Sequence, residues 1–133
     1  MRTSAFIDAS NLFYGGKKSL GWSIDYEKLL AYLKEKYDVK TAYYFGGVEI
    51  HRFPFDMAFR LMLEQNAFDR AVVLSGDGDF LPVLKYLRQN GKKMYVLARS
   101  RRTAKEIKQF AASEFRDFEY LRELLKRDDE ETV

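Results

Sequence analysis

The stretch that decides the fold is AVVLSGDGDF, residues 71–80. An apolar, β-branched run ends there at a glycine turn that carries two carboxylates, and a helical pattern follows as far as Asn90-Gly91. A buried strand that enters a helix through a tight turn places that turn at the carboxyl end of the strand, where open α/β sheets bind ligands. Two acids one residue apart are costly there unless a positive charge shares the site, so we expect a divalent metal.

A similar arrangement lies at the front of the chain, in SAFIDASNL, residues 4–12. A short apolar strand again ends at an acid, Asp8, and an amide, Asn11, follows three residues later. If the two strands are parallel neighbours, Asp8, Asp77 and Asp79 meet at one edge of the sheet. Three carboxylates and a carboxamide would form an all-oxygen site, which suits Mg²⁺ or Mn²⁺.

Hydrophobic periodicity predicts strands that alternate with helices along the whole chain. The expected strands are 3–8, 39–45, 71–75 and 94–98, with a short extended piece at 115. The expected helices are 25–37, 55–66, 80–90, 103–112 and 121–125, of which the fourth begins with a capping-box pattern from Thr103 to Glu106. This alternation predicts βαβ units and a Rossmann-like α/β three-layer sandwich with a mainly parallel sheet of four or five strands. We expect one domain over residues 1–127 and a disordered acidic tail at 128–133.

The composition of the 133 residues is that of a globular protein with a basic body. The net charge is +3 although the tail carries four acids, so the remainder is compatible with a nucleic-acid partner. There is no cysteine, hence no disulfide framework and no thiolate zinc site, which fits a cytoplasmic protein. No apolar run is long enough to span a membrane, and Asp8 interrupts the only candidate for a signal-peptide core.

The motifs FIDASN (6–11) and SGDGDF (75–80), followed by a helix and the strand entry at 91–93, resemble the NYN domain. NYN (LabA-like) domains belong to the PIN-like superfamily of metal-dependent nucleases. The resemblance extends over about residues 2–125. It implies a PIN-like sheet with an acidic metal site and RNA hydrolysis, so we expect a metal-dependent ribonuclease that uses Mg²⁺ or Mn²⁺.

The resemblance also implies roles for individual residues. Asp8, Asp77 and Asp79 would be catalytic metal ligands, or would hold metal-bound water. Asn11 would support the first acid or contact the scissile phosphate, and Ser75 would steady the turn.

Two departures from the family pattern affect the expected site. The family usually has glycine directly after the first acid, where this chain has Ala9, whose methyl group restricts close approach of a phosphate. The insert before the third helix is also short. Asp56 is the natural candidate for the acid that the family places near that helix start, and Met62 stands roughly where a further acid is often found.

Basic residues near the predicted sheet edge are candidates for contacts with RNA phosphates. They are Lys17 and Lys18 in the loop after the first acid, and Arg99, Arg101 and Arg102 after the fourth strand. Tyr14 and Trp22 are candidates for base stacking. For each group there is a structural alternative: a solvated helix face for the arginines, an N-cap role for Asp79, and an exposed loop position for His51, the only histidine.

Other functions fit these residues less well or remain open. The main alternative is a catalytically weak or inactive NYN-like RNA-binding or regulatory module, which Ala9 and the thinned acid set favour. A receiver-like domain needs a suitably placed lysine after a late strand, where this chain has Ala98-Arg99-Ser100. A Rossmann nucleotide binder needs a glycine-rich phosphate loop after the first strand, which is missing. A homodimer is also possible, with the apolar helix that begins at Phe55 helping to bury an exposed face.

Overall fold

A computed structural model of the chain describes residues 1–14, 22–46 and 56–128. The strands are β1 (Thr3–Asp8), β2 (Val39–Phe45), β3 (Arg70–Leu74), β4 (Lys93–Ala98) and β5 (Phe115–Asp117). The α-helices are α2 (Tyr26–Tyr37), α3 (Asp56–Leu63), α4 (Leu81–Gln89), α5 (Lys105–Ala111) and α6 (Arg122–Leu125). Short helical turns are η1 (Ser10–Tyr14), η2 (Gln65–Ala67), η3 (Gly78–Phe80), η4 (Ser100–Arg102), η5 (Ala112–Glu114) and η6 (Phe118–Leu121).

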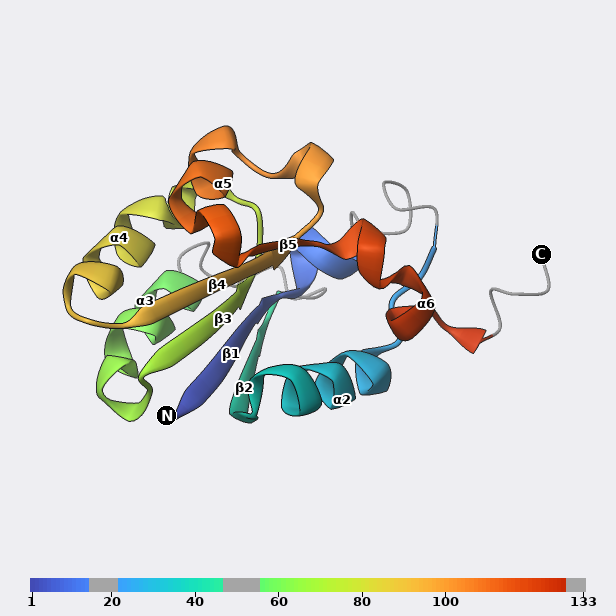
Figure 1. Cartoon of the computed structure of the whole chain (residues 1–133), viewed down its shortest axis with the longest axis horizontal. Helices are drawn as coiled ribbons and strands as arrows, with labels where there is room; N and C mark the ends of the chain where they lie inside the picture. The colour runs from blue at the N-terminus through green and yellow to red at the C-terminus, as the bar shows by residue number, and fades with distance from the viewer. Residues whose placement is uncertain (15–21, 47–55, 129–133) are drawn as a thin grey trace.

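All five strands pair in parallel, in the order β2-β1-β3-β4-β5. The chain moves outward from β1 to β2 through α2, returns across β1 to β3 through α3, and continues to β5 on the other side (Figure 1). The strand order therefore reverses between β1 and β3. In open α/β sheets this switch point is where ligands bind, outside the carboxyl ends of the strands.

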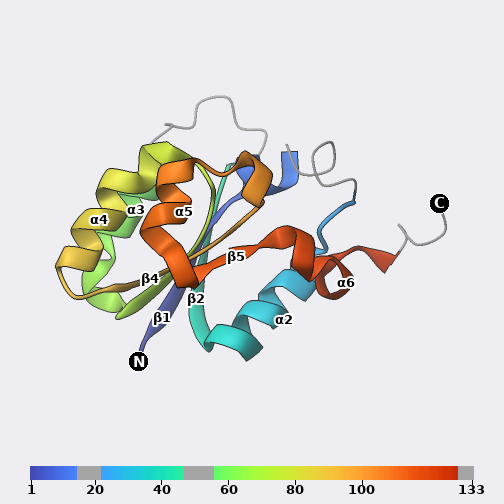
Figure 2. The same cartoon turned by 45° about the horizontal axis from the view of Figure 1, so that its top comes forward.

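Side chains that alternate along the strands supply two separate cores. Phe6, Val73 and Val96 belong to the core beneath α3, α4 and α5, whereas Ile7, Leu74 and Leu97 belong to the core beneath α2 and α6. Figure 2 shows the two groups of helices on opposite faces of the sheet. The expected three-layer α/β architecture is confirmed, with five strands, and the near-continuous apolar runs of β1 and β3 follow from burial on both faces.

The N-termini of α2 and α5 differ, because α2 has a side-chain cap and the capping box expected at α5 does not form. Asp25 caps α2 by accepting a hydrogen bond from the Lys28 backbone N–H at 3.2 Å. At α5 the predicted capping box does not form, because the N-cap position is Ala104 and has no side-chain bond. The Thr103 hydroxyl instead donates to the Arg99 carbonyl oxygen at 2.7 Å, which closes η4.

The remaining boundaries differ from expectation by a few residues. The third helix ends at Leu63 and is followed by the separate turn η2, instead of running to 66. The extended piece at 115 is the edge strand β5. Of the acidic tail expected at 128–133, Asp128 is described and pairs with Lys28, and residues 129–133 lie outside the described residues. Over the described ranges, no helix has the length and apolar character needed to cross a membrane.

Candidate functional site

Asp8 is the last residue of β1 and lies next to the first residue after β3, Ser75. The register pairs Ile7 with Leu74, so the two residues that follow them emerge side by side at the carboxyl edge. The Ser75 hydroxyl donates to Asp8 Oδ2 at 2.9 Å, and the backbone N–H of Asn11 donates to Asp8 Oδ1 at 3.2 Å. Both oxygens of this half-buried carboxylate are thus fixed in position.

The same hydrogen bonds continue into the turn after β3. The Asp77 backbone N–H donates to Ser75 Oγ at 3.2 Å, and the Gly76 N–H donates to Asn11 Oδ1 at 3.4 Å. Asn11 and Ser75 therefore connect the two acid-bearing turns, which come from strands almost 70 residues apart in sequence. Asn11 contacts Asp8 through its backbone N–H and the turn after β3 through its side chain, whereas Ser75 contacts both through its hydroxyl.

The electrostatics of Asp8 show that a second carboxylate is close. Burial raises the pKa of Asp8, and the negative charge of Asp77 raises it further, whereas the hydrogen bonds from Ser75 and from the backbone of Asn11 lower it. Within the described part of the chain, no ion pair to Asp8 or Asp77 is present. A cation shared by the two acids would favour their charged forms.

The N-cap role that the sequence offered as the structural alternative for Asp79 belongs to Asp77. Asp77, not Asp79, is the N-cap of η3, because Asp77 Oδ1 accepts the backbone N–H of Asp79 at 2.9 Å. Both residues are exposed. Across the described residues, no group of three His, Cys, Asp or Glu side chains is placed to hold one metal ion. The structure thus brings Asp8 and Asp77 close enough for their charges to interact, and Asp79 lies in η3.

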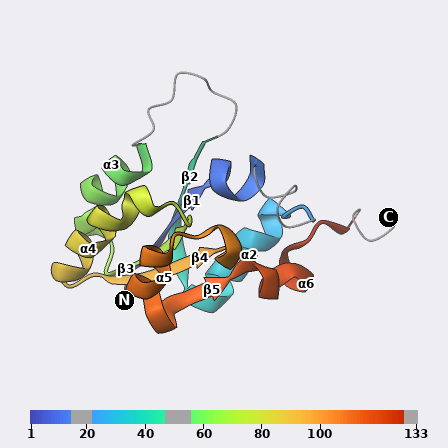
Figure 3. The same ribbon diagram turned by 90° about the horizontal axis from the view of Figure 1, so that it is seen from above.

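Gly76 keeps the acid turn in close contact with the segment that follows β4. A Cβ atom on Gly76 would lie 2.4 Å from Thr103 Oγ1 and 2.9 Å from Thr103 Cα, so only glycine fits without a shift. The Ala104 backbone N–H also donates to the Gly76 carbonyl oxygen at 3.0 Å. The segment that leads from η4 into α5 is therefore anchored beside the acid turn, and α5 lies beside α4 (Figure 3).

The basic candidates divide into paired and exposed residues. Arg99 has only 13% of its side chain exposed and forms an ion pair with Glu119, with Nε and Oε1 3.2 Å apart, so its main contact is structural. Arg101 and Arg102, in η4, are exposed. Lys17 and Lys18 lie outside the described residues, as does His51.

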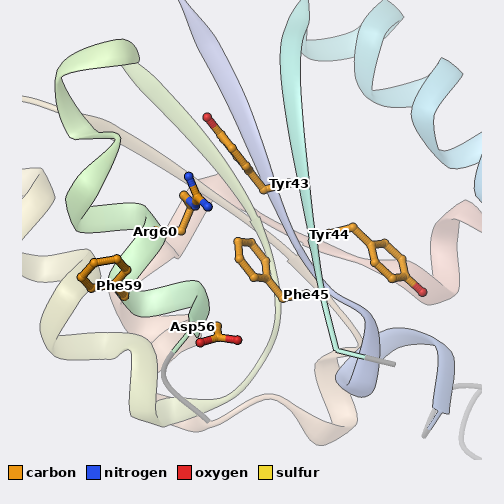
Figure 4. Close-up of a pocket in the computed structure, with 6 residues that line it drawn as sticks. All are labelled: Tyr43, Tyr44, Phe45, Asp56, Phe59 and Arg60. Carbon is orange, nitrogen blue, oxygen red and sulfur yellow. The ribbon is translucent and has the colours of Figure 1, made fainter. Parts of the chain in front are cut away.

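A pocket of about 340 Å³ lies between the carboxyl end of β2 and the beginning of α3. Figure 4 shows its lining, which consists of Tyr43, Tyr44, Phe45, Asp56, Phe59 and Arg60. Phe45 is the register partner of Asp8, so this pocket adjoins the acid site. The candidate acid Asp56 thus lies at the start of α3 and lines this pocket.

None of the aromatic residues that line the pocket was predicted from the sequence to stack on RNA bases, whereas Trp22 was. Trp22 is 1% exposed and belongs to the core beneath α2 and α6, so it is not available for stacking. The sequence did not single out Tyr43 or Phe45. The two rings are two residues apart in a strand that ends at Gly46, so they lie on one face of the strand near its end. This spacing was the signal in the sequence, and β2 is an edge strand.

The residues present fit a hard divalent cation. Asp8 and Asp77 supply carboxylate oxygens, and Ser75 and Asn11 supply neutral oxygens beside them. Mg²⁺ in proteins is commonly held by one or two carboxylates together with water and substrate phosphates, so two adjacent acids are a sufficient protein contribution. The half-buried, hydrogen-bonded position of Asp8 gives that donor set a fixed ligand.

Comparisons with known proteins agree with this architecture. In the solved structures, a protein of unknown function from Vibrio parahaemolyticus has the same fold, with a TM-score of 0.59 and 15% identity over 87% of this chain and 92% of that one. The comparison with curated proteins found no match. The NYN domain model matches residues 55–121, about half of the chain, and indicates a nuclease-like, RNA-related function of a type that generally uses divalent metals. The chain therefore belongs to the NYN domain family.

Proposed function

We propose that this protein is a divalent-metal-dependent ribonuclease that hydrolyses phosphodiester bonds at the carboxyl edge of its sheet. The observation that carries the proposal is the hydrogen-bonded pair of acid turns, in which Ser75 connects Asp8 to the turn of Asp77. This pair lies at the switch point between β1 and β3, where α/β sheets bind ligands. The NYN match supports the choice of RNA as substrate.

In this proposal Asp8 and Asp77 are the principal ligands of Mg²⁺ or Mn²⁺. Asp79, exposed on the same turn, and Asp56, at the start of α3, are the further candidate ligands. When bound, the metal supplies Lewis-acid polarisation of the scissile phosphate and activates a water molecule for attack. No histidine or cysteine nucleophile is required, which agrees with a cysteine-free chain that has one histidine.

The chain's own residues position the reacting groups. Ser75 and Asn11 hold the Asp8 carboxylate in one orientation, so no side-chain ordering is needed when substrate arrives. Arg101 and Arg102 are exposed directly before Thr103, which packs on Gly76 of the acid turn, and their positive charge would attract the RNA backbone.

The test is cleavage of labelled single-stranded and structured RNA in Mg²⁺, Mn²⁺ or EDTA. We expect cleavage with either metal, no cleavage in EDTA, and loss of cleavage in Asp77→Asn. The matched control is Asp69→Asn, because Asp69 is paired with Arg2 at the opposite end of β3. Cleavage that persists unchanged in Asp77→Asn, or in EDTA, would contradict the proposal.

The second candidate function is an NYN-like RNA-binding or regulatory module with little or no turnover. Two observations favour it: Ala9, which is fully buried directly after Asp8, and the lack of a three-acid group among the described residues. This module would bind RNA in EDTA and in Mg²⁺ alike, without cleavage. The same assay, read for binding as well as cleavage, separates the two functions.

A further inference from the structure

The pocket beside β2 has a chemical character different from that of the acid site. Tyr43 and Phe45 stack with ring centroids 6.4 Å apart and planes at 29°, and their rings face the pocket in Figure 4. The Arg60 guanidinium lies over the Tyr43 ring, 5.5 Å from its centroid. Phe59 is 66% exposed at the rim of the pocket, and Figure 4 shows its ring on the outer side of α3.

These side chains come from two elements that face each other. Tyr43 and Phe45 point from β2 toward α3, which contributes Phe59, Arg60 and, at its first turn, Asp56. Tyr44, between the two rings in sequence, turns to the other side of β2 and packs edge-on against Tyr26 of α2 at 5.3 Å. The pocket is thus an aromatic slot with a cation and an acid at its rim.

We propose that this pocket binds an unpaired nucleobase of an RNA whose backbone crosses the acid site. The inference rests on the proposed function and extends it, because it assigns a single-stranded substrate segment to a defined subsite. Unpaired bases are recognised by stacking on aromatic rings and on arginine planes, and by hydrogen bonds to their polar edges. Phe45 and Phe59 supply aromatic rings, and Arg60, which lies over Tyr43 and pairs with Glu64 at 3.2 Å, supplies a guanidinium plane with N–H donors.

The position of the pocket supports a nucleotide neighbouring the scissile phosphate. Phe45 and Asp8 are paired across adjacent parallel strands, so the slot opens one strand spacing from the acid site. The pocket volume of about 340 Å³ lies in the range of small-ligand sites and accommodates a base with part of its sugar. A duplex keeps its bases stacked inward, so the slot selects single-stranded RNA.

Binding in EDTA tests the pocket without requiring catalysis. A short single-stranded RNA that carries 2-aminopurine is titrated with the protein, and anisotropy and 2-aminopurine emission are recorded. The variants are Phe59→Ala, Phe59→Trp and the control Tyr86→Ala, since Tyr86 is an exposed ring on α4, 46% exposed, that does not line this pocket. Thermal unfolding and gel filtration of each variant report folding and self-association.

We expect Phe59→Ala to bind this RNA about five- to a hundredfold more weakly, while Phe59→Trp and Tyr86→Ala bind like the parent. The salt dependence of binding should be unchanged in Phe59→Ala, because stacking releases no counterions. Unchanged affinity of Phe59→Ala, equal weakening by Tyr86→Ala, or a change in oligomeric state that accounts for the loss would each overturn the inference.

The base-pocket inference and the ribonuclease proposal can each fail without the other. A parent protein that binds RNA through Phe59 but never cleaves it would refute the ribonuclease and retain the base pocket. A protein that cleaves RNA with the Phe59→Ala affinity unchanged would retain the ribonuclease and refute the base pocket. A parent that binds no single-stranded RNA at all would refute the base pocket directly.

Discussion

The Ser75 hydroxyl donates to Asp8 Oδ2 across 2.9 Å and accepts the backbone N–H of Asp77, so one buried serine joins the two acid turns of the sheet. Asp8 is thereby held at the end of β1 by a residue that follows β3. The two strands are parallel neighbours because the chain places β2 on one side of β1 and then crosses over to place β3 on the other. The tertiary fold, and not a local motif, assembles the site.

Ser75→Ala removes this connection. A hydrogen bond to a charged group contributes about 1.5–3 kcal/mol, and we expect the free energy of unfolding to fall by about that amount. Urea denaturation in EDTA measures the change. In an Asp8→Asn background the same serine substitution should cost less, because the bond is no longer charge-assisted; an equal cost in both backgrounds would show that Ser75 does not act through Asp8.

Asp8→Asn should stabilise the metal-free protein at neutral pH. Burial raises the folded-state pKa of Asp8 above its unfolded value, so the folded state binds the proton more tightly. The wild-type protein therefore gains stability from this group as the pH falls through that raised pKa, and loses it again as the pH rises. The asparagine variant lacks this dependence.

Urea midpoints of the wild-type and Asp8→Asn proteins, measured in EDTA over a pH series, check this sign. The advantage of the variant should shrink as the solution is acidified toward the unfolded-state pKa. Addition of Mg²⁺ at neutral pH should raise the stability of the wild-type protein alone. An advantage that grows on acidification would refute the account of Asp8.

Gly76→Ala should destabilise the protein by about 1–3 kcal/mol, because its methyl group would overlap with Thr103. The matched control is Gly78→Ala, in the same turn, whose nearest contact would be the Ala104 methyl carbon at 3.1 Å. We expect a smaller loss there. Equal unfolding free energies for the two variants would mean that the packing of η4 on the acid turn is looser than described.

Arg101→Ala and Arg102→Ala should weaken RNA binding uniformly across sequences. Removing one cation from an RNA phosphate reduces the slope of log K against log salt concentration by about 1. Lys85→Ala, an exposed residue of α4, is the control and should leave the slope unchanged. Identical slopes in all three variants would exclude η4 from the RNA path.

Arg99→Ala should behave differently from its two neighbours. Its side chain is largely buried and paired with Glu119, so the substitution should lower the unfolding free energy by about 1–3 kcal/mol. The measurement is urea denaturation beside Arg101→Ala, which should unfold like the parent. A loss of RNA affinity in Arg99→Ala with unchanged unfolding free energy would show instead that Arg99 contacts the RNA.

The sequence predicted the sheet because strand and helix periods alternate cleanly from Thr3 to Leu125. It also predicted that the turns of Asp8 and Asp77 would meet, since parallel strands end at one edge. It could not assign the N-cap of η3, because Asp77 and Asp79 both precede the helical segment expected from the sequence. Only the backbone geometry shows that Asp77 is the cap. The pocket was missed because Phe59 and Tyr43 resemble core residues until the edge position of β2 is known.

The most direct test of the central claim is a single-turnover measurement of RNA cleavage in Mn²⁺, with enzyme in excess, for the wild-type protein, Asp8→Asn, Asp77→Asn and the double variant. If the two carboxylates act as one site, each single substitution should remove nearly all activity and the double variant should lose little more. Wild-type cleavage rates in either single variant, or losses that simply multiply in the double variant, would contradict the account.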